Sequence, residues 1–215
     1  MASLLAGSPQ SRCLSPVSYF LLYAVVVLVA VPEALAVKTV VLDPGHGGRD
    51  NGARWGGVSE KDLNLDVAKR VEALLKKRGI PVAMTRRSDV YVSIEARAAK
   101  ANRYKDSLFV SIHFNAVTDK SITGIETFYL STRGSKLANS IQRRLAKRIR
   151  TNDRGTKKHH YAVLRKTRGV AVLVECGFIS NGWERKRCSA SWYKDILAEE
   201  IASGIAAHWA YYKNR

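Results

Sequence analysis

Short apolar runs alternate along the chain with longer stretches in which apolar residues recur every three or four positions. Such runs, rich in β-branched and aromatic residues and bounded by turn residues, predict buried strands. Five strands are expected, at residues 38–42, 80–85, 108–113, 125–130 and 171–174. The alternation of apolar and polar residues within 125–130 favours an edge strand for that segment.

The longer stretches predict four helices, at residues 59–79, 93–104, 135–150 and 196–211. Ser59 and Asp62 form a capping-box pattern at the start of the first helix, and Gly79 is a suitable C-terminal cap. Strands that alternate with helices predict an α/β fold. We expect a single domain with a twisted, mostly parallel sheet and helices on both faces.

The N-terminal segment differs from the rest of the chain. It contains two charged residues, residues 17–31 are almost all apolar, and Ala34-Leu35-Ala36 is a small-residue cleavage pattern. This layout predicts a secretory signal peptide over residues 1–36 and a mature domain over 37–215. An uncleaved membrane anchor is the alternative, but the run is shorter than the ~20 residues of a spanning helix. We therefore expect an exported protein of the periplasm or cell envelope.

Lysine and arginine outnumber aspartate and glutamate by 36 to 18, and the expected mature chain keeps the net charge of +18. So basic a chain can indicate nucleic-acid binding. We expect no nucleic-acid partner, because the protein is expected outside the cytoplasm and its cations lack interleaved aromatic residues. Electrostatic association with an anionic envelope is the expected role of the charge, with plain solubility as the alternative.

Two cysteines, Cys176 and Cys188, remain in the expected mature chain. Two cysteines are too few for a disulfide framework. A single bridge and a pair of packed free thiols both fit the sequence.

Four ionisable residues fall where a ligand would bind. His46, His113 and Glu175 stand at or just past the carboxyl ends of predicted strands, and Glu60 opens the first predicted helix. Two imidazoles and one carboxylate form a known catalytic zinc set, and a further carboxylate can act as general base. Singly, each residue also fits a structural role, such as a packed histidine or a helix-start carboxylate. Together they favour a metal site, although spacing alone does not separate three ligands from one base.

Four stretches carry a resemblance to a known family: VVLDPGHGGRDNGA, SEKDLNL, SIHFNA with GIETFYL, and AVLVECGFISN. In this order they resemble the zinc-dependent N-acetylmuramoyl-L-alanine amidases of the type 3 family, which split peptidoglycan. The resemblance implies His46, Glu60 and His113 as ligands of Zn²⁺ and Glu175 as the catalytic glutamate. It also implies a peptidoglycan substrate, cut at the amide between N-acetylmuramic acid and L-alanine.

Three further residues are candidates for substrate contacts: Arg49, Asn51 and Asn115. Turn chemistry explains Asn51 equally well. Two rival functions remain at this point: another zinc hydrolase, such as a peptidase that cuts within the stem peptide, and a non-catalytic basic protein that binds the wall. The stem-peptide preference and any activating protein partner are left open.

Overall fold

The computed structural model describes residues 39–213, with side chains up to Tyr211. The expected signal peptide, residues 1–36, lies outside the described residues. Among the described helices, none combines the length and the apolar character needed to cross a membrane.

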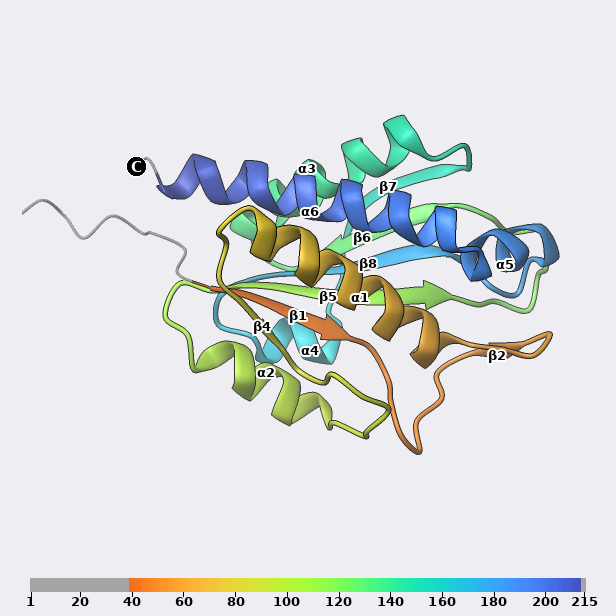
Figure 1. Ribbon diagram of the computed structural model, residues 1–215, viewed down its shortest axis with the longest axis horizontal. Coiled ribbons are helices and arrows are strands. Elements are labelled where there is room, and N and C mark those ends of the chain that lie inside the picture. Colours follow the sequence, from red (N-terminus) through yellow and green to blue (C-terminus); the bar gives the residue numbers. More distant parts are fainter. Residues whose placement is uncertain (1–38, 214–215) are drawn as a thin grey trace, which may run out of the picture. The chain divides into compact units, whose positions relative to one another are not determined.

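Six strands form the central sheet: β1 (Val40–Pro44), β4 (Val82–Met84), β5 (Leu108–Asn115), β6 (Ile125–Tyr129), β7 (Asp153–Lys158) and β8 (Val170–Phe178). Their order is β4-β1-β5-β8-β6-β7 (Figure 1). Neighbours from β4 to β8 are parallel, whereas β6 is antiparallel to β8 and parallel to β7. The prediction of a mostly parallel sheet is confirmed. A short hairpin of β2 (Arg54–Trp55) and β3 (Val58–Ser59) lies outside this sheet.

Helices cover both faces of the sheet, as the sequence predicts. One face carries α1 (Glu60–Lys77), α3 (Thr132–Arg148), α5 (Gly182–Ser189) and α6 (Ser191–Lys213), and the other carries α2 (Ile94–Asn102) and α4 (Ala162–Lys166) (Figure 1). The larger apolar core lies on the first face, where residues such as Val71, Leu145 and Ile201 pack against β1, β5 and β8. Phe109 and Leu173 belong to a smaller core on the second face.

The edge-strand prediction for residues 125–130 is wrong, because β6 lies between β8 and β7. Strand β7 has the sequence DRGTKK, which contains no apolar residue and therefore gives no strand pattern. Its start is held by Gln142 of α3, whose Nε2 donates to Asp153 Oδ1 at 2.6 Å. Helices α3 and α6 begin earlier than expected, and the short helices α4 and α5 were not predicted.

Local details also differ from the expectations. Ser59 is the N-cap of α1, but its side chain makes no capping bond. Its hydroxyl instead donates to the carbonyl of Asn51 at 3.2 Å, so the capping-box prediction is wrong.

Cys176 and Cys188 are both buried free thiols, which settles the open choice between a bridge and packed thiols.

Candidate metal centre

The β1–α1 loop, residues 45–59, brings the end of β1 close to β5 and α1. His46 adopts a positive φ of 60°, which is uncommon for a residue other than glycine. A Cβ at Gly45 would lie 2.2 Å from the His113 ring, and a Cβ at Gly52 would lie 2.5 Å from the Glu60 carboxylate. Glycine at these two positions therefore allows the histidines and the glutamate to approach one another.

Two buried arginines hold the start of this loop. Arg86 donates to the carbonyls of Pro44 at 3.0 Å and Gly45 at 2.8 Å. Arg97 donates to the carbonyls of Pro44 at 2.7 Å and His46 at 2.6 Å. Buried carbonyls outside a helix or strand need such donors, because an unpaired one is costly. The backbone of His46 is thus fixed by charge-assisted hydrogen bonds.

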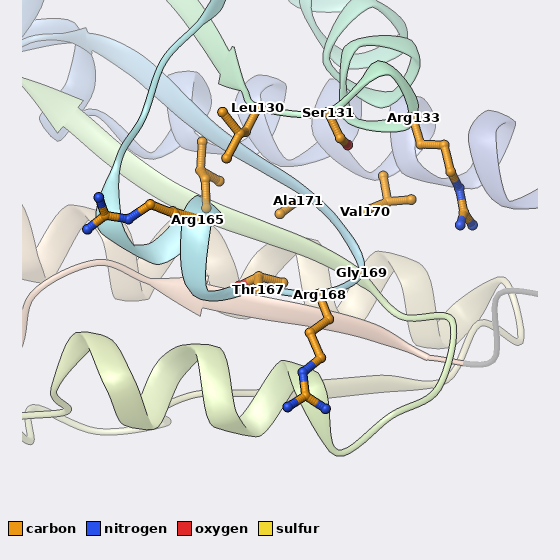
Figure 2. A pocket seen from close by; sticks show the side chains of 10 residues that line it. Leu130, Ser131, Arg133, Arg165, Thr167, Arg168, Gly169, Val170 and Ala171 are labelled. Carbon is orange, nitrogen blue, oxygen red and sulfur yellow. The ribbon is translucent and has the colours of Figure 1, made fainter.

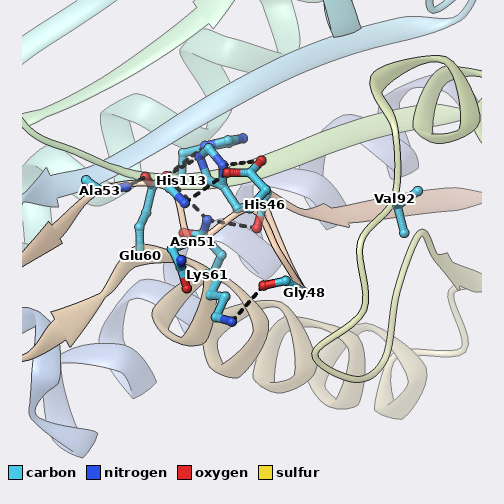
Figure 3. Close-up of polar contacts among 12 residues, drawn as sticks. His46, Gly48, Asn51, Ala53, Glu60, Lys61, Val92 and His113 are labelled. Carbon is cyan, nitrogen blue, oxygen red and sulfur yellow. Dashed lines mark hydrogen bonds and ion pairs between the residues drawn. The ribbon is translucent and has the colours of Figure 1, made fainter.

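His46, Glu60 and His113 bring one ligand atom each to within 4.8 Å of one another (Figure 3). Glu60 Oε1 lies 3.2 Å from His46 Nε2 and 2.9 Å from His113 Nδ1. Glu60 Oε2 accepts the backbone N–H of Ala53 at 2.9 Å, which orients the carboxylate. The structure therefore brings together a residue of the loop after β1, the first residue of α1 and a residue of β5.

The charges of this cluster depend on one another. Burial raises the pKa of Glu60, but hydrogen bonds from His113 and His46 outweigh it and bring that pKa far below its ordinary value. Burial lowers the pKa of His46, and hydrogen bonds to Glu60 and Asp50 more than offset this, so that the pKa is raised. The cluster thus keeps a buried carboxylate charged between two imidazoles.

Asp50 is a site residue that the sequence analysis missed. Its Oδ2 lies 2.8 Å from His46 Nδ1, so that Nε2 of the same ring faces Glu60. A carboxylate on the second nitrogen of a ligand histidine fixes its tautomer and ring orientation. The available signal was an acid four residues after His46 within the same glycine-rich loop.

Glu175 lies beside His113, because the two residues pair in register between β8 and β5. It is 8% exposed, and its Oε2 is buried with no hydrogen-bond partner in the described part of the chain. Burial raises the pKa of Glu175 well above its ordinary value, and the charges of Glu60 and Glu126 add to this. Strand β8 continues past Glu175, and Cys176 lies in the larger apolar core on the face of the sheet that carries α1, α3 and α6, as alternation predicts.

A cavity of about 360 Å³ opens onto this cluster, with His46, His113 and Glu175 in its lining. Arg49 is exposed and lies over the ring of Tyr91, another lining residue, at 4.1 Å. Asn51 and Asn115 are not among the residues that line the cavity. The carbonyl of Asn51 accepts from the N–H of Lys61 at 3.3 Å, and Asn115 Nδ2 donates to Glu126 Oε1 at 3.0 Å.

The arrangement of these side chains defines a class of site. Two imidazole nitrogens and one carboxylate oxygen, held by rigid elements and open to a cavity, form the donor set of a catalytic metal site. An unpaired buried carboxyl in the same cavity adds a group that can transfer protons. These features together are typical of a metal-dependent hydrolase.

Comparison with known proteins agrees with this class. Residues 40–207 match the Amidase_3 family, described as N-acetylmuramoyl-L-alanine amidase, and the chain belongs to this family. Among solved structures, the chain is similar to the amidase AmiC2 of Nostoc punctiforme, with a TM-score of 0.77 and 36% identity over 80% of this chain and 97% of that one. It is also similar to an N-acetylmuramoyl-L-alanine amidase of Clostridium difficile 630, with a TM-score of 0.76 and 38% identity over 81% of this chain and 98% of that one.

A curated relative is longer than this chain. The N-acetylmuramoyl-L-alanine amidase LytC of Bacillus subtilis (strain 168) is 37% identical over 176 residues, which is 80% of this chain and 36% of LytC. The chain thus spans about a third of that relative.

Proposed function

We propose that this protein is a zinc-dependent amidase that hydrolyses the bond between N-acetylmuramic acid and L-alanine in peptidoglycan. One observation carries the proposal: His46, Glu60 and His113 converge beside the unpaired carboxyl of Glu175, in a chain that belongs to the amidase family. This substrate follows from the family and the zinc from the donor set.

The donor set fits zinc, because two neutral imidazoles and a carboxylate leave a fourth position for water. His46 Nε2, His113 Nδ1 and Glu60 Oε1 are the atoms that would hold it, since these nitrogens both face the same carboxylate oxygen. When bound, zinc supplies a Lewis acid that polarises the scissile carbonyl and lowers the pKa of water. Asp50 orients His46 for this role.

Glu175 acts as the proton-transfer group. Its Oε2 accepts a proton from the attacking water and later donates it to the nitrogen of the departing L-alanine. The water oxygen bonds to the lactyl carbonyl carbon, and the carbon–nitrogen bond breaks. The products are a lactyl carboxylate on the glycan and a stem peptide with a free amine.

Three further residues are proposed to contact the substrate: Arg49, Asn51 and Asn115. Arg49 is exposed beside Tyr91 of the cavity, where its cation can reach a peptide carboxylate. Asn115 lines a neighbouring hollow of about 380 Å³ that shares Tyr161 with the metal-site cavity. The stem peptide of a bound substrate can extend from the scissile bond through the metal-site cavity into this neighbouring hollow.

The protein is proposed to act outside the cytoplasm, after removal of residues 1–36 as a signal peptide. The support is the apolar stretch before Ala34-Leu35-Ala36 together with a family that acts on the cell wall. The charge of +18 favours association with an anionic envelope.

Two measurements test the function. Purified residues 37–215 should contain about one zinc ion per chain, and metal analysis of a mildly purified sample that finds none would contradict the metal site. Mass spectrometry of digested peptidoglycan should find free stem peptides that begin with L-alanine and uncut glycan strands. Cleavage within the stem peptide would favour the peptidase, and no product at all would favour the non-catalytic wall-binding protein.

A further inference from the structure

A second hollow, of about 300 Å³, opens where the end of α3 meets α5 and the start of α6. We name it the Trp–Arg hollow after five residues in its lining, Arg148, Arg150, Trp183, Arg187 and Trp192. None of these residues takes part in the metal centre. The hollow lies at the same end of the sheet as Glu175, because α5 follows β8 directly and α3 runs back antiparallel to β6.

Two tryptophans form exposed walls of this hollow. Trp183 is 57% and Trp192 is 56% exposed, although exposure of so large an apolar side chain to water is unfavourable. Arg187 lies 4.2 Å over the Trp183 ring and donates to the carbonyl of Arg150 at 2.8 Å. These contacts fix Trp183 in position. Large aromatic side chains held open to solvent in this way mark a binding site.

Positive charge extends from the hollow along α3. Arg148 also lines a larger hollow of about 680 Å³, together with Arg143, Arg144 and Lys147. Glu200 is the one acidic residue in the lining of these two hollows among the described residues. A row of cations on one helix suits a linear polyanion better than a single small ion.

Arginine side chains alone do not set the Trp–Arg hollow apart from other hollows, because the whole chain is strongly basic. A hollow of about 210 Å³ beside the start of β8 is lined by Arg133, Arg165 and Arg168, whose side chains point away from one another (Figure 2). No aromatic side chain lines it. The Trp–Arg hollow differs because flat apolar rings and guanidinium groups share one concave surface.

We propose that the Trp–Arg hollow binds the peptide-free glycan strand that the amidase reaction leaves behind. The inference rests on the proposed function, because hydrolysis converts each cut lactyl amide into a carboxylate. The product is therefore a chain of pyranose rings with repeated negative charges. The rings can pack on Trp183 and Trp192, and Arg148 and Arg150 can bind the carboxylates with their planar forks.

Binding of this product would keep the enzyme on strands where stem peptides remain to be cut. An anionic bilayer is the competing occupant, since tryptophan and arginine also favour membrane interfaces. The concave shape favours the glycan, because a bilayer is bound by side chains that protrude from a surface.

Binding of four probes to the full mature chain tests the proposal by titration calorimetry at physiological salt. The probes are peptide-free peptidoglycan strands, neutral N-acetylglucosamine oligomers of similar length, polyphosphate, and phosphatidylglycerol vesicles. None of them contains the scissile amide, so binding is measured without turnover. The peptide-free strands should bind about tenfold or more tightly than either the neutral oligomers or polyphosphate.

Matched variants locate the binding surface. Trp183→Ala with Trp192→Ala should weaken strand binding about tenfold or more, whereas Tyr104→Ala, which removes another exposed aromatic ring, should change it less than about twofold. Arg148→Gln with Arg150→Gln should also weaken binding. Lys77→Gln with Arg103→Gln removes the same charge elsewhere and should have little effect. Thermal melting shows whether each double variant is folded. If the double tryptophan variant does not fold, the double arginine variant still tests the proposal.

The outcomes separate this inference from the proposed function. Support requires that the tryptophan variant keeps its rate on a soluble muramoyl-peptide but digests intact wall more slowly. Strand binding that does not depend on these residues, equal binding of polyphosphate, or tryptophan-dependent binding of vesicles alone would overturn the inference. An absence of hydrolysis of every peptide-bearing substrate would instead contradict the proposed function, even with strand binding intact.

Discussion

The β1–α1 loop is held by polar contacts. By contrast, the helix-side core, in which α1, α3 and α6 pack on the sheet, is held by apolar contacts. In the loop, backbone carbonyls of Gly45 and His46 accept from buried arginines. In the core, side chains such as Leu145 and Ile201 are fully buried against other apolar groups. Directional polar contacts position single atoms, whereas apolar packing is roughly proportional to area. The placement of the proposed metal ligands and the stability of the fold should therefore respond to different substitutions.

Glu175→Gln should have the largest effect, and this effect should fall on turnover and not on stability, because Glu175 lines the site cavity. It removes the proposed proton-transfer group with little change in size, so turnover should fall by about 10²–10⁴-fold while metal content and melting temperature stay nearly unchanged. Steady-state hydrolysis and metal analysis measure both. Glu199→Gln is the matched control, because it makes the same change at an exposed carboxylate of α6 outside both hollows of the site. Full turnover in Glu175→Gln would remove this residue from the mechanism.

Arg97→Leu should lower both metal affinity and stability, because Arg97 binds the β1–α1 loop and also pairs with the buried Asp43 of β1. Its loss leaves the carboxylate of Asp43 and the carbonyl of His46 without their buried cationic donor, whereas Arg86 still donates to the carbonyl of Pro44. The free energy of unfolding should fall by about 3–5 kcal/mol in urea titrations, and metal affinity should fall with it. The exposed Arg103→Leu should change neither quantity. Wild-type metal binding in Arg97→Leu would show that the loop does not need this anchor.

Leu145→Ala should affect stability alone. Leu145 is fully buried between α3 and the sheet, so its truncation should cost about 2–5 kcal/mol of unfolding free energy. Metal content and turnover at 25 °C should remain those of the wild type, provided that the chain is folded. A lower metal affinity in this variant would show that the helix-side core and the loop are coupled.

Asp50→Asn should have the smallest effect, and on the loop alone. Asp50 has a half-exposed side chain and orients His46 without holding the fold together. Metal affinity, measured by competition with a chelator, should fall about 10–100-fold. The melting temperature of the metal-free protein should hardly change, since exposed substitutions cost about 0.5 kcal/mol or less. Unchanged metal affinity would contradict the orienting role.

Most of the fold could be predicted because its strands are buried on both faces. Strands β1, β5 and β8 each contain a run of mostly apolar residues, so these runs and the turn residues around them identify the strands. Strand β7 could not be predicted, because its place is determined by pairing with β6 and by Gln142, and its own side chains are polar. Tertiary pairing here overrides local pattern.

The metal-site cluster could be predicted for a similar reason. Carboxyl ends of neighbouring parallel strands meet at one edge, so the positions of His46, His113 and Glu175 in the sequence imply their proximity. The contact between Asp50 and His46 depends on loop conformation, which apolar patterning does not encode. The Trp–Arg hollow could not be predicted, because its residues come from α3 and the turn after it, from α5 and from the start of α6. No apolar periodicity predicts α5 or the first turns of α6.

The position of β8 in the sheet has a consequence for the order in which the protein is completed during synthesis. Strand β1, which the His46 loop follows, and strand β5, which carries His113, pair with each other directly, without β8. By contrast, β6 and β7 join them only through β8, which is made of residues 170–178. A growing or truncated chain that stops before residue 170 lacks Glu175 and leaves unpaired the edges of β5 and β6 that β8 covers. The strand that carries Glu175 is therefore also the strand that protects these two edges from edge-to-edge aggregation.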